Sequence, residues 1–197
     1  MTTTSRRPRS MASDSPEGFR YVDGLLEPNE ERRLIALLEE LPWEAVIFRG
    51  YEARRRVVHF GHRYDFEARG VSPGLSIPPA LLDLRRGVGE VAGEDPERFV
   101  EVLATEYRPG ATIGWHSDAP AFGATVLGVS LASACRMRFR RKTSEGWLRW
   151  DRVLDPRSAY VIGGAARSEW QHSIPPTEAL RYSITYRTVR VNHQAGG

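Results

Sequence analysis

The chain has 197 residues, and its formal charge of +3 is the balance of 28 basic and 25 acidic side chains. Hydrophobic residues make up 41% and charged residues 27%, which is typical of one globular domain and excludes a disordered or fibrous chain. A single cysteine, Cys135, excludes an internal disulfide framework, and no apolar run approaches the roughly 20 residues that span a bilayer. We therefore expect a cytoplasmic monomer without membrane contact.

Arginine supplies 27 of the 28 basic residues, and Lys142 is the only lysine. Arginine clamps carboxylates and phosphates through a planar, permanently charged fork, so its abundance is consistent with an anionic partner. A GC-rich genome also replaces lysine by arginine throughout. The composition leaves both interpretations open.

The elements expected in chain order begin with a disordered leader over residues 1–16, which has almost nothing to bury. No apolar segment follows its arginine pair, so we do not interpret it as an export signal. Residues 17–99 are expected to form an N-terminal extension. It has a helix from Pro28 or Asn29 to about Pro42, a β-hairpin rich in aromatic and branched residues, and a second helix that starts near Pro79.

From residue 100 to residue 197 the pattern changes to at least seven short strands separated by Gly, Pro, Asp and Ser. This spacing is typical of a β-sandwich or jelly roll. The predicted fold is therefore mainly β (α+β), with helices first and a jelly-roll core after them, in one domain overall.

Three features of the β region indicate a single site. In "GWHSD", His116 and Asp118 are two residues apart, so an extended strand would place both side chains on one face, where both could reach one metal ion. His172 in "WQHSIPP" supplies a second imidazole. Two histidines and one carboxylate form the facial triad of non-haem Fe(II) oxygenases, although a lone histidine is more often a surface or core residue.

The third feature is "RYSITYR", in which polar and apolar residues alternate. A period of two places Arg181, Ser183 and Arg187 on the same face of one strand, with the two arginines roughly 20 Å apart end to end. Two fixed guanidinium groups could hold the two carboxylates of a dicarboxylic acid. The alternative is an exposed face of an amphipathic edge strand.

Taken together, "EYRPGATIGWHSD", "WQHSIPP" and "RYSITYR" resemble the AlkB-like branch of the Fe(II)/2-oxoglutarate dioxygenases. The resemblance covers roughly residues 18 to 190. It implies a double-stranded β-helix (jelly roll) core over residues 100–197 and an extension over residues 17–99 that forms a substrate lid. It also implies Fe(II) as cofactor, with 2-oxoglutarate and O2 as co-substrates.

The resemblance assigns the iron ligands to His116, Asp118 and His172. It also implies that Arg181 and the Tyr107 hydroxyl bind the distal carboxylate of 2-oxoglutarate. Arg187 would lie near the metal-proximal end of the co-substrate.

Three positions depart from the family pattern. Thr105 and Ser183 stand where the family has asparagine, and both can still donate a hydrogen bond to the co-substrate. Pro120 stands where DNA-repair members carry an acidic residue that recognises the methylated base. Because proline offers no side-chain hydrogen bond, the substrate does not follow from those members.

Two basic and aromatic segments suggest nucleic acid as the substrate. Between Arg136 and Arg152 there are seven basic residues against two acidic ones, interleaved with Trp147 and Trp150 on which bases could stack. The hairpin adds a second such segment. The candidate substrate-binding residues are Tyr51, Arg54, Arg55, Arg56, Phe60, Trp115, Arg140 and Arg141, and the alternative is a solvated arginine face with the tryptophans in the core.

The function that these features favour is oxidative removal of N-alkyl groups from alkylated DNA or RNA. A hydroxylase of modified tRNA or of protein is an alternative that Pro120 keeps open. A non-catalytic jelly-roll binding module is another, although every triad and arginine position is filled.

Overall fold

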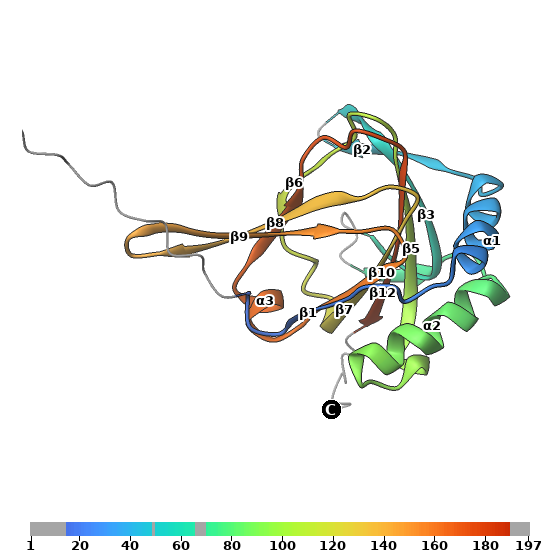
Figure 1. Ribbon diagram of the computed structural model, residues 1–197, viewed down its shortest axis with the longest axis horizontal. Coiled ribbons are helices and arrows are strands. Elements are labelled where there is room, and N and C mark those ends of the chain that lie inside the picture. Colours follow the sequence, from blue (N-terminus) through green and yellow to red (C-terminus); the bar gives the residue numbers. More distant parts are fainter. Residues whose placement is uncertain (1–14, 49, 66–69, 190–197) are drawn as a thin grey trace, which may run out of the picture.

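A computed structural model of the chain describes residues 15–48, 50–65 and 70–189, which form two antiparallel β-sheets and a few helices (Figure 1). Residues 1–14 of the expected leader lie outside the described part. The strands are β1 (Phe19–Val22), β2 (Glu44–Phe48), β3 (Tyr51–Asp65), β4 (Gly70–Pro73), β5 (Phe99–Tyr107), β6 (Ile113–His116), β7 (Phe122–Leu131), β8 (Cys135–Thr143), β9 (Gly146–Leu154), β10 (Ser158–Ile162), β11 (Gln171–Ile174) and β12 (Arg181–Val189). The helices are α1 (Pro28–Glu39), α2 (Pro79–Ala92), the 3-10 helix η1 (Pro96–Arg98) and α3 (Gly164–Ser168).

Both predicted N-terminal helices form, and local signals explain where they begin and end. Pro28 and Pro79 each occupy a first helical position, where the missing N–H of proline costs nothing. At the start of α1, the Glu30 carboxylate accepts a hydrogen bond of 2.8 Å from the backbone N–H of Glu27. Gly93 ends α2 in the left-handed conformation, with φ at 70°.

The large sheet has the strand order β1-β10-β7-β12-β5-β3-β2, with β4 beside β3, and the small sheet has the order β6-β11-β8-β9. Two antiparallel sheets with few helices confirm the predicted jelly-roll class. The extension is not separate from this core, because β1 pairs with β10 and β3 pairs with β5.

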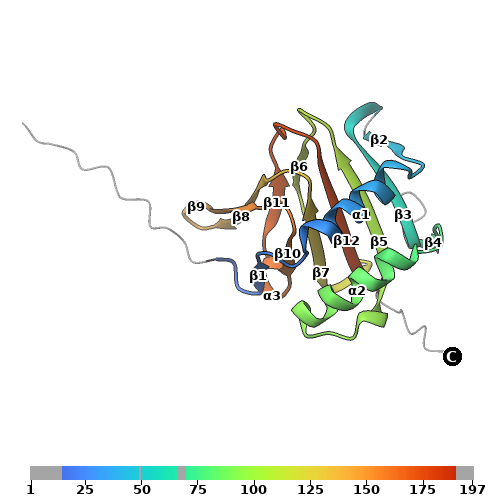
Figure 2. The ribbon, with the colours of Figure 1, turned by 45° about the vertical axis from the view of Figure 1, so that its right-hand side comes forward.

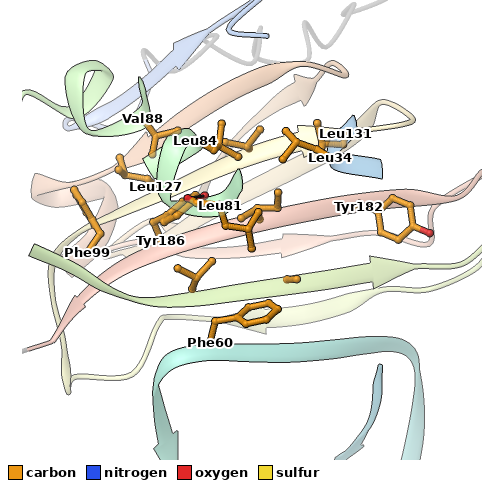
Figure 3. Close-up of a cluster of buried hydrophobic side chains, with 14 of the residues drawn as sticks. Leu34, Phe60, Leu81, Leu84, Val88, Phe99, Leu127, Leu131, Tyr182 and Tyr186 are labelled. Atoms are coloured by element: carbon orange, nitrogen blue, oxygen red, sulfur yellow. Dashed lines mark hydrogen bonds between the residues drawn. The ribbon is translucent and has the colours of Figure 1, made fainter. Parts of the chain in front are cut away.

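The two faces of the large sheet have different roles because side chains alternate along each strand. One face packs under α1 and α2, as Figure 2 shows, and forms a hydrophobic cluster that includes Leu34, Leu81, Phe60 and Tyr186 (Figure 3). The other face is turned toward the small sheet and carries most of the polar residues of β5 and β12, among them Thr105, Arg181 and Ser183. The helices therefore cover the sheet from behind, and on its other face the polar side chains lie beside a second hydrophobic cluster, which includes Phe139, Tyr160 and Ile174.

Among the described residues, the helices are too short or too polar for any of them to cross a lipid bilayer.

Candidate active site

The strands β5 and β12 bring the predicted co-substrate residues together. Their register places Arg181 opposite Tyr107 and Ser183 opposite Thr105. These positions are two residues apart on each strand, so all four side chains share the face that is turned toward the small sheet. The alternation read from "RYSITYR" therefore describes an interior surface rather than an exposed edge.

Arg181 is the most unusual residue of this surface, because its guanidinium is fully buried and only partly bonded. Its exposed fraction is 0%, and its Nε donates to Ser130 Oγ at 3.1 Å. The Tyr107 and Cys135 side chains lie beside it, with its guanidinium 5.0 Å from the centre of the Tyr107 ring. However, Nη1 and Nη2 have no hydrogen-bond partner within the described residues. A buried charge with two unpaired donors is costly, and a carboxylate would satisfy both donors at once.

Tyr160 on β10 places a further hydroxyl near Arg181 and Ser183, and the sequence analysis did not identify this residue. Burial raises the pKa of Tyr160 to about 12, so the hydroxyl stays protonated, and it interacts with Ser183 and Arg181. Its ring lies over Gly128, its cross-strand partner on β7, where a Cβ would come within 2.0 Å of the ring. Gly128 therefore makes the room that Tyr160 occupies.

We expect Gly128→Ala to weaken 2-oxoglutarate binding, because the added methyl group must displace the Tyr160 phenol. Losing one hydrogen bond to a carboxylate predicts a dissociation constant about tenfold higher, measured by calorimetry under anaerobic conditions. Gly87→Ala is the matched control, because nothing lies within 4 Å of its added methyl on α2. Equal affinities in the two variants would contradict this role of Gly128.

The predicted metal ligands lie near one another where β6 pairs with β11. His116 and His172 are cross-strand partners, and their ring centres are 4.3 Å apart. Asp118 follows the end of β6 instead of continuing the strand, and its Oδ2 lies 3.7 Å from His172 Nε2. Arg167 on α3 holds this loop by donating to the carbonyl oxygens of Asp118 and Ala119, at 3.3 and 3.0 Å.

The protonation states of the three side chains suit metal binding. Burial lowers the pKa of His172 to about 4 and also lowers the pKa of His116, so both imidazoles are neutral near pH 7. Burial is the largest single influence on Asp118 and would raise its pKa, but Arg187, His172, Arg167 and His116 together outweigh burial and the pKa falls to about 2. The site thus offers two neutral imidazoles and one carboxylate.

Arg187 orients the carboxylate of Asp118. Its Nε donates to Asp118 Oδ1 at 2.9 Å, and its Nη1 contacts both carboxylate oxygens of Glu101, at 3.2 and 3.0 Å. Burial opposes the charge of Arg187, but Glu101 and Asp118 raise its pKa further than burial lowers it. Glu101 was not identified from the sequence, although it lies on the same face of β5 as Thr105 and Tyr107.

The donor set fits a divalent iron ion. Asp118 Oδ2 is buried without a hydrogen-bond partner among the described residues, and His116 Nδ1 lies 2.9 Å from the Gly114 carbonyl, which leaves its Nε2 to bind metal. In the part of the chain that the structure describes, no three such side chains already converge as metal ligands. Binding therefore requires a side-chain adjustment, and it is the chemistry of the donors that supports the fit.

Two of the expected substrate residues, Phe60 and Arg56, lie on the other face of the large sheet. Phe60 is 2% exposed and packs in the core beneath the helices, because its position on β3 points it away from the small sheet. Arg56 shares that side of the sheet, where its Nε and Nη2 bind the Glu106 carboxylate at 2.6 and 2.9 Å. An interior ring and a neutralised guanidinium are both unsuited to holding a base.

The other hairpin candidates differ in their relation to the site. Arg55 is on the site face of β3 opposite Tyr107, and its Nη1 lies 3.4 Å from the Thr112 carbonyl. It is near enough to His116 to influence the pKa of that imidazole. Arg54 is exposed and its guanidinium lies over Gly110. The side chain of Tyr51 lies outside the described residues.

The candidates on the small sheet lie on other surfaces. Trp115 points away from His116, to the outer face of the sheet, where it contacts Arg140. Arg141 forms an ion pair with Glu169, with 2.6 Å between Nη1 and Oε2. Neither Trp115 nor Arg140 faces the space between the sheets.

Comparisons with known proteins agree with this geometry. The sequence profile of the 2OG-Fe(II) oxygenase superfamily matches residues 18–192. A mimivirus protein named L905 (Acanthamoeba polyphaga mimivirus) is 26% identical over 87% of this chain and 85% of its own length. Mouse tRNA (carboxymethyluridine(34)-5-O)-methyltransferase ALKBH8 is 28% identical over 92% of this chain, and bovine alpha-ketoglutarate-dependent dioxygenase alkB homolog 3 is 28% identical over 71%.

The match spans only 27% of mouse ALKBH8 and 53% of the bovine protein. Among solved structures, that of OsALKBH1 superimposes with a TM-score of 0.65, at 15% identity, and covers 89% of this chain and 98% of that one. This structure shares the fold.

Proposed function

The chain belongs to the 2OG-Fe(II) oxygenase superfamily, and on that premise we propose that it oxidatively removes N-alkyl groups from the bases of DNA or RNA. The observation that carries the assignment of its site is the buried Arg181, whose two unpaired donors face the interior that also holds His116, Asp118 and His172. The end of this interior at Arg181 suits a carboxylate, and the end at His116, Asp118 and His172 suits a metal ion.

The residues of the chain would bind 2-oxoglutarate by its two ends. Arg181 takes the distal carboxylate, with Tyr107, Tyr160 and Ser183 as hydroxyl partners, and Thr105 adds a further hydroxyl opposite Ser183. The keto-acid end then lies toward His116, Asp118 and His172. Because most of these side chains are buried, binding excludes water from the reacting atoms.

Bound Fe(II) would activate O2, so that one oxygen atom enters a substrate C–H bond while 2-oxoglutarate takes up the other and is converted to succinate and CO2. Hydroxylation of an N-methyl group gives a hemiaminal, which releases formaldehyde and leaves the free base. Arg187 keeps Asp118 ionised and turned so that Oδ2 is available. Arg167 fixes the loop that carries this carboxylate.

The relatives support a nucleic-acid substrate. One of the proteins that resemble this chain, from Arabidopsis thaliana, is named alkylated DNA repair protein ALKBH8 homolog and is 26% identical over 83% of this chain. Arg55, near the metal ligands, adds a positive charge beside the position that a substrate must reach. Its guanidinium is suited to contact a phosphate.

The proposal is tested with single-stranded DNA and RNA oligonucleotides that carry N-methyladenine or N-methylcytosine. We expect formaldehyde and succinate in equal amounts with a methylated strand, and neither product with His116→Ala. If every methylated strand yields no formaldehyde while 2-oxoglutarate is still slowly consumed, the demethylase assignment fails and the oxygenase assignment stands.

Hydroxylation of a modified tRNA is the second candidate, and Pro120 favours it. The position two residues after Asp118 has no side-chain hydrogen bond to offer to a methylated base, and mouse ALKBH8, which is named for a tRNA reaction, matches 92% of this chain. Mass spectrometry of nucleosides from treated tRNA distinguishes the two. A gain of one oxygen atom without formaldehyde supports hydroxylation.

A further inference from the structure

The outer face of the small sheet carries a row of cationic side chains. Along β8, Met137 and Phe139 point into the core, and the residues between and beside them point outward. This outward row consists of Arg136, Arg138, Arg140 and Lys142. Successive members are about 6.6 Å apart along the strand, which is comparable with the spacing of phosphates in an extended polynucleotide.

Two tryptophans alternate with two of these arginines on the same face. The Arg140 guanidinium lies 4.5 Å from the centre of the Trp115 ring and 4.3 Å from that of Trp147, and Arg138 lies 5.1 Å from Trp115. We call these four side chains the outer ladder. The outer ladder extends from Trp115 on the edge strand β6, over the arginines of β8, to Trp147 on β9. Figure 1 shows that β8 and β9 extend out from the body of the protein.

Hydrogen bonds fix the arginines of the outer ladder without neutralising them. Arg138 Nε donates to Ser173 Oγ at 3.1 Å, and Arg140 Nε donates to Gln171 Oε1 at 2.8 Å. Neither arginine forms an ion pair with any residue that the structure describes, whereas the neighbouring Arg141 is paired with Glu169. The two guanidinium groups are thus held in place, and their charge is available to an anion.

The tryptophans of β9 show the same division between core and surface. Trp150 faces inward, with its ring centre 4.9 Å from that of Phe19 and 5.4 Å from that of Phe139. Trp147 faces outward and is 45% exposed. Five cationic residues, the β8 row and Arg149, share this face with one acidic residue, Asp151, which contacts Arg136 at 3.6 Å.

We propose that the outer ladder binds single-stranded nucleic acid, with phosphates on Arg138 and Arg140 and a base stacked on Trp147. Fixed cations next to an exposed aromatic ring match the two chemical features that every polynucleotide strand repeats. Trp115 directly precedes His116, and β6 is the edge strand of the small sheet. A polynucleotide bound to the outer ladder would therefore pass round this edge to reach the proposed metal ligands. The ladder would thus hold unmodified nucleotides that flank the reacting base.

The proposal builds on the nucleic-acid substrate proposed above, but its test needs no turnover. Binding of fluorescein-labelled unmodified single strands, DNA and RNA in separate arms, is measured by anisotropy with the full chain over a range of salt concentrations. We expect Trp147→Ala to raise the dissociation constant about five-fold or more, and Trp147→Phe to restore most of the affinity. We expect Arg138→Gln with Arg140→Gln to reduce the salt slope by about 1.4.

The control for charge is Arg33→Gln with Arg86→Gln, which removes two positive charges from α1 and α2 and should leave the slope unchanged. Thermal unfolding midpoints verify that each variant is folded. Equal binding by the ladder variants and the control would overturn the proposal, as would a wild-type protein that binds neither strand at low salt. A change confined to oligomeric state on gel filtration would also overturn it, because the face would then be a contact between copies of the chain. If the protein binds the strands through the outer ladder but demethylates none of them, the proposed function fails and the binding proposal stands.

Discussion

Replacement of His116 by alanine is expected to abolish succinate release. His116 and His172 are cross-strand partners, and with Asp118 they are the side chains that offer iron two neutral imidazoles and one carboxylate. Losing a group that merely supports a metal ligand already costs about 10- to 100-fold in affinity or activity, and losing a ligand itself costs more. We therefore expect a fall of at least about 100-fold, to the level of a reaction without protein.

Succinate formation with saturating Fe(II) and 2-oxoglutarate measures this effect. Ser117→Ala is the matched control, because Ser117 lies between two of the proposed ligands and its side chain is exposed. The metal-free His116→Ala protein should unfold at the wild-type temperature or above it, since a partly desolvated imidazole is removed. Substantial turnover by this folded variant would mean that His116 is not a ligand, and equal loss in Ser117→Ala would assign the effect to the loop.

Arg181→Met is expected to raise the dissociation constant for 2-oxoglutarate about 30-fold or more. Truncating one partner of a buried charge pair has this cost, because the other charge is left without compensation. The same substitution removes a buried guanidinium that has two unpaired donors in the co-substrate-free protein. We therefore expect that the variant without co-substrate is no less stable than the wild type, and that its stabilisation by 2-oxoglutarate is lost.

Pyruvate provides the matched ligand for this variant, because it has the keto acid but lacks the distal carboxylate. Anaerobic binding of both compounds should show that Arg181→Met loses affinity for 2-oxoglutarate and keeps whatever weak affinity for pyruvate the wild type has. A proportionate loss for both would indicate that the substitution disturbs the whole interior, and the distal-carboxylate role of Arg181 would be abandoned.

The sequence predicted correctly which residues of β12 share one face, because polar and apolar residues alternate regularly along that strand. The alternation in β12 placed Arg181, Ser183 and Arg187 on one face, and their register with β5 needed no irregularity before Arg187. The same rule applied to β5 would have found Glu101, which lies four and six residues before Thr105 and Tyr107.

Other site residues depend on which strands become neighbours, and a local pattern does not contain that information. Tyr160 reaches Arg181 because β10 lies two strands from β12 with Gly128 of β7 between them. Arg167 reaches the Asp118 loop from a five-residue helix that the sequence analysis did not predict. Asp118 was expected within a strand, but the strand ends at His116.

The chemistry of a basic or aromatic residue in a strand does not say which face of the sheet the residue occupies. Phe60 and Arg56 are an even number of residues apart and share the face behind the sheet, while Arg55 is on the site face. Trp115 and His116, as neighbours in β6, point to opposite faces by the same rule.

Anaerobic addition of Fe(II) and 2-oxoglutarate to the protein tests most directly whether this interior holds both together. A 2-oxo acid chelated to Fe(II) gives a weak visible charge-transfer band. We expect the band in the wild type, its absence in His116→Ala, and its appearance in Arg181→Met only at much higher 2-oxoglutarate concentration. A folded wild-type protein that shows no band at saturating Fe(II) and 2-oxoglutarate would contradict the account.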